Sequence, residues 1–140
     1  MSENADCEEA KTSALRWIDA SRAALSADHM LLWHLHEPSW REYKSSRWYM
    51  DRLEREGFAV ERGSAGMPTA FRARWSNGQG PVIAGYAEYD AVPGQSQDPV
   101  PYRKPRDGVS RHAAGHTDPH SALGMGSFAG FLAAKHAMEA

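Results

Sequence analysis

Residues 111–121 bring imidazole and carboxylate groups together in one short segment of the chain. The side chains in it that could do chemistry are His112, His116, Asp118 and His120. Neutral imidazole nitrogen and carboxylate oxygen are ligands that zinc and its first-row neighbours accept readily, and a loop allows several to converge on one ion. Gly115 and Pro119 argue against a helix here. The spacing therefore predicts a metal site carried by a loop.

A second acidic segment, residues 88–94, follows the most apolar stretch of the chain. Residues 81–87 are nearly all apolar or small, which predicts a strand buried on both faces. Ligands of open α/β sheets bind at the carboxyl ends of strands, which is where Glu88 and Asp90 are expected. Two interpretations stay open for each residue. Asp90 either faces the site or caps a turn, and Glu88 either approaches a metal or is an ordinary exposed carboxylate.

Two helices are predicted in the first half of the chain. Residues 12–35 carry apolar side chains at helical spacing, and Pro38 is expected to end that helix. Ser39 and Glu42 have the spacing of a capping box, which predicts the start of a second helix. Gly57 is a suitable stop for it.

The apolar period changes from that of a helix to that of a strand after the second helix. Residues 58–61 and 71–75 alternate as strands do, the latter with one wet face. Asn77 and Gly78 form a turn dipeptide, which predicts a hairpin between the second of these strands and residues 81–87. Residues 95–110 are polar and rich in proline, which is typical of an irregular connection.

Composition limits the classes of protein to which the chain can belong. Its 140 residues, 41% hydrophobic and 24% charged, fit one domain over residues 1–140 with no second domain. A net charge of -2 without a basic stripe excludes nucleic acid as an expected partner, and no apolar run reaches the roughly 20 residues needed to cross a bilayer. The only cysteine, Cys7, suggests a reducing cytoplasm. A final helix begins near Leu123 and meets no stop signal before Ala140, so we expect the sequence to be part of a longer chain.

Five motifs in order resemble a known family. They are Glu42-Tyr43-Lys44-Ser45-Ser46, Glu56-Gly57-Phe58, Gly66-Met67-Pro68-Thr69-Ala70-Phe71, Glu88-Tyr89-Asp90-Ala91-Val92-Pro93-Gly94 and His112-Ala113-Ala114-Gly115-His116. Together they resemble the N-terminal part of the zinc-dependent amidohydrolases and metallopeptidases of aminoacylase and carboxypeptidase type. The branch they resemble most is that of the p-aminobenzoyl-glutamate hydrolases.

The resemblance implies a fold and a reaction. The fold would be the N-terminal part of a zinc-exopeptidase-like α/β/α sandwich with a mixed sheet, and the full-length relatives would be homodimers. The reaction would be hydrolysis of an amide bond next to a carboxylate in a small molecule, such as an N-acyl amino acid, an aminobenzoyl-glutamate or a dipeptide. The cofactor would be a divalent metal bound at a two-metal site, with Zn²⁺ expected and Mn²⁺ or Co²⁺ as alternatives.

The resemblance also assigns roles to individual residues. Asp90 matches the acidic residue that orients the metal ligands, and His116 matches the histidine of a Cys-Gly-His ligand motif. Ala114 stands where that motif has its cysteine. We therefore expect Asp118 to bridge the metals, with His116 or His120 as a terminal ligand.

The family's general-base glutamate and its later histidine ligands lie downstream of the matched segment. We therefore expect this polypeptide alone to bind metal weakly at most and to catalyse no turnover. The alternative is a non-catalytic binding or assembly protein derived from the same fold. The remaining imidazoles, of His29, His34, His36 and His136, are expected to have no chemical role, and His112 is expected at the surface or behind the ligands.

Overall fold

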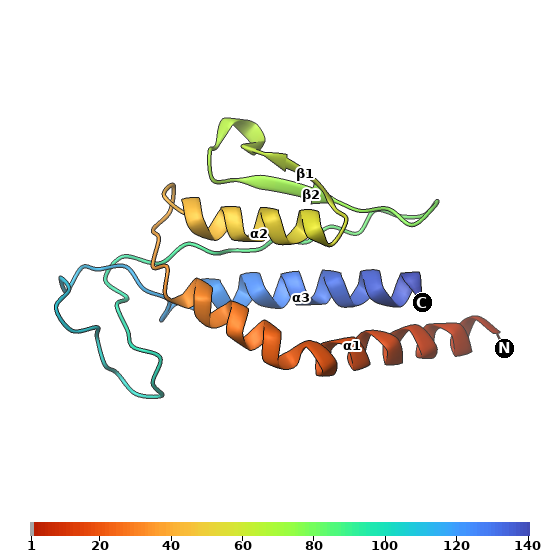
Figure 1. Ribbon diagram of the computed structural model, residues 1–140, viewed down its shortest axis with the longest axis horizontal. Helices are drawn as coiled ribbons and strands as arrows, with labels where there is room; N and C mark the ends of the chain where they lie inside the picture. The colour runs from red at the N-terminus through yellow and green to blue at the C-terminus, as the bar shows by residue number, and fades with distance from the viewer. Residues whose placement is uncertain (1) are drawn as a thin grey trace.

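The structure is a computed structural model that describes residues 2–140 and, from residue 6 onward, their side chains. Its elements in chain order are α1 (Ser2–Trp33), α2 (Tyr43–Arg55), β1 (Ala59–Arg62), the short 3-10 helix η1 (Ser64–Gly66), β2 (Phe71–Arg74) and α3 (His120–Glu139). Helix α3 lies beside α1, and α2 lies with the two strands on the other side of α3 (Figure 1). Helices are thus combined with one small sheet, which agrees with the expected α/β class at that coarse level.

Helix α1 is longer than its apolar pattern predicts. It begins at Ser2 rather than near residue 12, and it ends at Trp33, ahead of Pro38 as expected. Its apolar side chains reach the core unevenly. Leu32 is fully buried, and Trp17 and Leu25 are packed against the core, whereas Leu15 is 66% exposed.

Helix α2 begins close to the predicted position, but a different residue caps it. The carboxylate of Glu37 accepts hydrogen bonds from the backbone amides of Lys44 and Ser45, which satisfies two of the free donors in the first helical turn. The predicted capping box is therefore wrong. Ser39 instead donates to Asp90, and Glu42 accepts from the buried Thr69 hydroxyl at 2.7 Å.

The two strands pair with each other rather than with the apolar stretch that follows them. β1 and β2 form a two-stranded antiparallel sheet in which Val60 faces Ala73. The hairpin predicted across Asn77 and Gly78 is absent from the described residues. Residues 81–87 form no strand there either, and they are largely exposed, with Val82 at 94%. The prediction of a strand buried on both faces is therefore wrong for this chain.

The segment that should have been that strand runs antiparallel along α3 instead. The Asn77 amide donates to the Met138 carbonyl near one end of α3, and Ser127 donates to the Tyr86 carbonyl near the middle. At Gly124 the approach is closest, because a Cβ there would lie 2.1 Å from the Glu88 carbonyl oxygen. The small residues of α3 thus allow this segment to end at the first turn of the helix.

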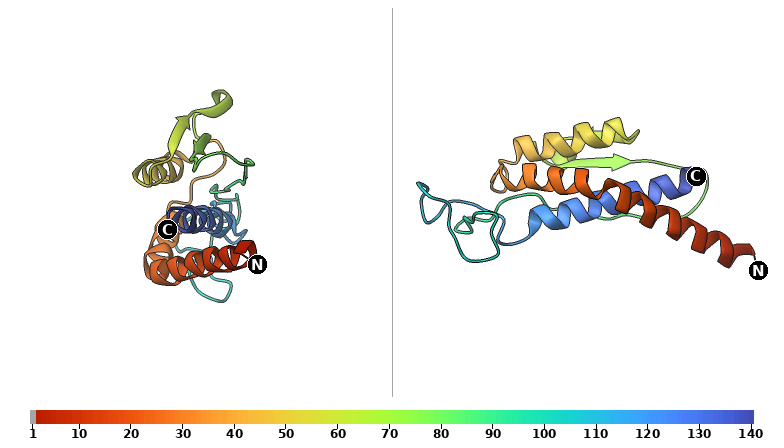
Figure 2. Two further views of the ribbon diagram at one scale, coloured as in Figure 1. Left: turned by 90° about the vertical axis from the view of Figure 1, so that its right-hand side faces the viewer. Right: turned by 60° about the horizontal axis from the view of Figure 1, so that its bottom comes forward.

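The core lies between the three helices. Its buried members are Leu32, Tyr49, Leu53, Met125, Phe128 and Leu132. Aromatic rings dominate the centre, where Tyr49 contacts Phe128 edge to face at 5.8 Å between ring centroids. Among residues 2–140, none of the helices is both long and apolar enough to cross a membrane. Figure 2 shows the irregular connection between residues 95 and 119 projecting beyond the helical layers, at the end where α1 finishes and α3 begins.

Candidate metal centre

The His-rich loop is fixed to the acidic segment by backbone pairing. The amide of Val92 donates to the Gly115 carbonyl at 2.9 Å, and the amide of Gly115 donates back to the Val92 carbonyl at 3.1 Å. A third bond joins the Gly94 amide to the His112 carbonyl. The loop packs so closely that a Cβ on Gly115 would lie 2.1 Å from the Gln95 carbonyl oxygen. The turn that carries His116 therefore folds back onto the residues that follow Asp90.

Asp90 holds the ring of His120. Oδ1 of Asp90 lies 2.9 Å from Nδ1 of His120, and Oδ2 accepts a hydrogen bond from the Ser39 hydroxyl. An ionised carboxylate only accepts hydrogen bonds, so Nδ1 of His120 carries the hydrogen and donates it. Nε2 is then the nitrogen left for another partner. Carboxylates that orient metal-binding histidines in this way are common behind metal ligands.

The free nitrogen of His120 faces two further carboxylates. Nε2 lies 3.6 Å from Glu88 and 3.7 Å from Asp118. Neighbouring ligand atoms around a tetrahedral ion with bonds of about 2.1 Å are separated by about 3.4 Å, so each pair is near that spacing. Among the residues described, however, no group of three or more His, Cys, Asp and Glu side chains is placed to hold one ion.

The pKa values of Asp90 and His120 are both shifted in the direction that favours the charged form. Burial raises the pKa of Asp90, but the hydrogen bonds from Ser39 and His120 outweigh it and leave that pKa below its ordinary value. Burial lowers the pKa of His120, whereas Asp90, Glu88 and Asp118 raise it, and the net direction is upward. The carboxylates thus create a site of negative potential around this imidazole.

His116 has the opposite environment. It is 2% exposed, and neither of its ring nitrogens has a hydrogen-bond partner among the described residues. Burial and then the neighbouring His36 lower its pKa to about 4, against a smaller opposing effect of Asp90. His116 is therefore neutral near pH 7 and keeps a lone pair available. Buried polar groups without partners are uncommon, and each calls for an explanation, which a ligand would provide here.

The last residue of α1, Trp33, and His36 just after that helix place their rings beside His116. The ring of His36 stacks with it at 6.3 Å between centroids, and Trp33 lies at 6.0 Å. Nε2 of His36 and Nε1 of Trp33 are also buried without partners. His36 adopts a left-handed backbone conformation (φ 50°), which is unusual for a residue with a side chain and is found often at functional sites.

Sequence reasoning gave His29 and His36 no role, yet both lie in this cluster. His29 is within hydrogen-bond distance of Ser121 at 3.1 Å, and burial lowers the pKa of each imidazole. The only local signal in the sequence was that His34 and His36 are two residues apart and close to Pro38. It could not reveal a neighbour 80 residues away.

The structure thus brings together most of the residues singled out in the sequence. Asp90, Asp118, His120 and Glu88 form one group, and His116 lies beside it at the buried end. His112 lies outside the group, where Arg111 donates to its ring. The donors are nitrogen and oxygen only, which suits zinc, manganese or cobalt, and the two unpartnered nitrogens of His116 are consistent with a metal ligand. Side chains would have to move for three ligands to converge on one ion.

Comparison with known proteins gives a curated relative that matches most of the chain. The chain is 34% identical to a subunit of p-aminobenzoyl-glutamate hydrolase from Escherichia coli (strain K12) over 122 residues, which are 87% of this chain and 25% of that protein. No protein-family model matches the chain, and no solved structure does. The match confirms the resemblance drawn from the five motifs. The chain spans about a quarter of the length of this relative.

Proposed function

We propose that this chain, a relative of the p-aminobenzoyl-glutamate hydrolase of Escherichia coli, provides part of the catalytic domain of a metal-dependent amidohydrolase. The substrate class is a small molecule with a carboxylate next to the amide bond, such as an N-acyl amino acid, an aminobenzoyl-glutamate or a dipeptide. The observation that carries the proposal is the cluster of His120, Asp90, Glu88 and Asp118 beside the unpartnered His116.

Each residue has a proposed task in that site. His116, Asp118 and His120 would hold a divalent cation, with Zn²⁺ preferred and Mn²⁺ or Co²⁺ as alternatives. Asp90 would fix the tautomer and orientation of His120 through Nδ1. A bound cation would polarise the substrate carbonyl and lower the pKa of a water molecule. Asp118 is 49% exposed in its side chain, which leaves it accessible from solvent for a role shared between two ions.

The fold of the whole protein is part of the proposal. Residues 1–140 would be the N-terminal part of an α/β/α sandwich, and residues 81–87 would join a larger mixed sheet there. The exposed apolar side chains of Val82, Ile83 and Tyr86 support this placement, because isolated chains seldom leave such a row in water. The full-length protein would be a cytoplasmic homodimer.

The same exposed row also supports a second candidate function. A non-catalytic chain derived from this fold could use it to bind a partner or to assemble. Hydrolysis separates the two functions when it is measured on a chain extended to the full length of the relative. The catalytic proposal expects release of the amine from N-benzoyl-glutamate at a rate above a blank that contains metal alone, and the binding proposal expects none.

For the 140-residue chain itself we expect no turnover. The experiment incubates the purified chain with Zn²⁺ and N-benzoyl-glutamate and measures amine release against the metal-only blank. A rate above the blank that falls in Asp118→Ala would show that the residues present here suffice, contrary to our expectation that residues outside this segment supply the general base.

The metal-ligand assignment is tested by Asp118→Ala. We expect this change to weaken Zn²⁺ binding by roughly tenfold or more, because it removes an anionic oxygen from the site. Competition with a chromophoric chelator of comparable Zn²⁺ affinity measures the change. Asp107→Ala is the matched control, because Asp107 is an exposed carboxylate of the neighbouring connection. Equal affinities of Asp118→Ala and the unchanged chain would refute the assignment of Asp118.

A further inference from the structure

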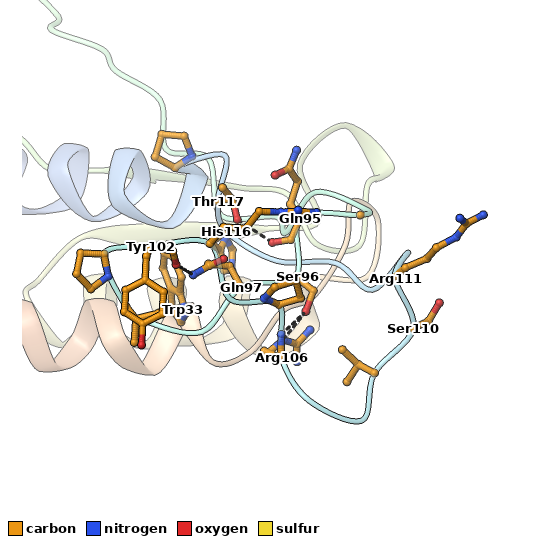
Figure 3. Close-up of a pocket in the computed structure, with 17 residues that line it drawn as sticks. Trp33, Gln95, Ser96, Gln97, Tyr102, Arg106, Ser110, Arg111, His116 and Thr117 are labelled. Atoms are coloured by element: carbon orange, nitrogen blue, oxygen red, sulfur yellow. Dashed lines mark hydrogen bonds between the residues drawn. The ribbon is translucent and has the colours of Figure 1, made fainter.

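The connection between residues 94 and 119 lines an open cavity of about 670 Å³, to which His116 and Trp33 also contribute (Figure 3). That volume is within the range of small-molecule sites. His116 is also one of the residues assigned to the candidate metal centre, and Thr117 and Pro119 of the lining flank Asp118 in the chain. The cavity therefore adjoins the candidate metal centre.

The charges that line the cavity are all of one sign. Arg103, Arg106 and Arg111 contribute to the lining, and no aspartate or glutamate does so among the described residues. The ion pair found in this connection joins Lys104 to Asp98, and within residues 6–140 none of the three arginines lies within 4.0 Å of a carboxylate. A cavity with three unpaired guanidinium groups favours an anion.

Arg106 is the best placed of the three. It is half-buried, and its Nε and Nη2 donate to the Ser96 hydroxyl and the Ala114 carbonyl. These bonds fix the guanidinium plane and use two of its five N–H donors, so three remain for a ligand. Figure 3 shows Arg106 close to Ser96 beneath the His116 region, whereas Arg111 points away from the other labelled side chains.

The rest of the wall suits an apolar, flat group. Trp33 and Tyr102 both line the cavity (Figure 3), and proline and valine side chains also contribute to the lining. Nε1 of Trp33 is buried and has no hydrogen-bond partner in the part of the chain described. Aromatic surface with a few fixed donors is typical of sites that bind small organic ligands.

We propose that this cavity binds the carboxylate of a small aromatic acid, with Arg106 as the partner of the carboxylate and with Trp33 and Tyr102 in contact with the ring. The inference rests on the proposed function only for its biological meaning, because it makes the cavity the place where the substrate's acid group is recognised. Binding of the acid itself requires no metal. Arg106 would then decide which amides the neighbouring centre receives.

The probe for this proposal is benzoate, titrated into the 140-residue chain in the presence of EDTA and followed by isothermal titration calorimetry. We expect Arg106→Gln to weaken benzoate binding about tenfold, as loss of a charge-assisted bidentate contact does. Arg106→Lys keeps the positive charge and should restore part of the affinity, which guards against a simple loss of folding. Arg41→Gln makes the same change of charge at an exposed arginine outside the cavity lining and should leave binding within about twofold.

Two further probes define the chemistry of the ligand. Benzyl alcohol has the ring without the charge and should bind at least about tenfold more weakly than benzoate. Inorganic phosphate has the charge without the ring and should compete poorly. Phosphate that competed as well as benzoate would overturn the aromatic part of the proposal, and equal benzoate affinity in Arg106→Gln would overturn it entirely.

Failure here and failure of the proposed metal centre give different results. Asp118→Ala should lose Zn²⁺ affinity and keep benzoate affinity, whereas Arg106→Gln should do the reverse. Unchanged Zn²⁺ binding in Asp118→Ala with intact benzoate binding would remove the metal assignment and leave the cavity standing. Normal Zn²⁺ binding with no measurable benzoate binding in the unchanged chain would remove the cavity alone.

Discussion

Gly124→Ala should lower the free energy of unfolding by about 3 kcal/mol, because the new methyl group has no space. A Cβ at this position would lie 2.1 Å from the Glu88 carbonyl oxygen and 2.7 Å from the Tyr49 hydroxyl. Overpacking a closely packed site typically costs about 1–3 kcal/mol, and the nearest atom here belongs to the backbone and cannot rotate away. Urea unfolding followed by circular dichroism measures the change.

The same helix contains its own control. Gly126 lies two residues further along α3, is exposed, and has nothing within 4 Å of an added Cβ. Gly126→Ala should therefore stabilise the chain by about 0.5–1 kcal/mol through helix propensity alone. If both variants shifted stability in the same direction, the close approach of residues 81–90 to α3 would be wrong. Gly124→Ala should also disturb the candidate metal centre, because the contact between Gly124 and Glu88 positions Glu88 and Asp90.

His116 should make the metal-free chain sensitive to acid. Its pKa is about 4 in the folded chain because the ring is buried, compared with about 6.5 when the chain is unfolded. Between these pH values the unfolded chain binds more protons, so the free energy of unfolding falls as the pH is lowered through this window. A difference of this size corresponds to about 3 kcal/mol, all of it present above pH 6.5 and lost near pH 4.

The measurement is urea unfolding with EDTA at several pH values from 7 to 4.5. His116→Leu should abolish most of the decrease, and it should also raise stability at pH 7 because two buried, unpartnered nitrogens are removed. His112→Leu removes an exposed imidazole four residues earlier and should leave the decrease in place. Burial also lowers the pKa values of His29 and His36, so both make the free energy of unfolding fall at low pH. They account for any decrease that remains in His116→Leu. A pH profile unchanged by His116→Leu would contradict the buried environment assigned to this ring.

Local patterns in the sequence predicted the helices but not the sheet. Helix periods and stop signals such as Gly57 act over a few residues, so α2 and α3 were placed well. Residues 71–74 pair with the nearby β1, whereas residues 81–87 lie along α3, held by contacts with distant residues such as that of Ser127 with the Tyr86 carbonyl. The capping prediction failed for the same reason, because Ser39 and Glu42 are engaged by distant partners, Asp90 and Thr69.

Some residues of the candidate metal centre and its cavity could likewise be predicted from the sequence, and others could not. Asp118 and His120 are close in sequence, and the motif that contains Asp90 indicated the third member, so their grouping could be anticipated. Trp33 and His36 could not, since only the packing of α1 beside α3 brings them to His116. Arg106 was hidden for another reason. A charged residue in a proline-rich connection looks solvated until the bonds to Ser96 and Ala114 are seen.

The segment before Asp90 is attached to the rest of the chain through its acceptors and side chains. Its Tyr86 carbonyl is bonded to Ser127, but none of the backbone amides of residues 79–90 donates a hydrogen bond to another described residue. Such a row of free donors is a template for an added strand. Any strand that pairs with it would restrict the position of Asp90 and, through Nδ1, of His120. Pairing of this segment with an added strand and binding of a cation at the centre are therefore coupled, so each should strengthen the other.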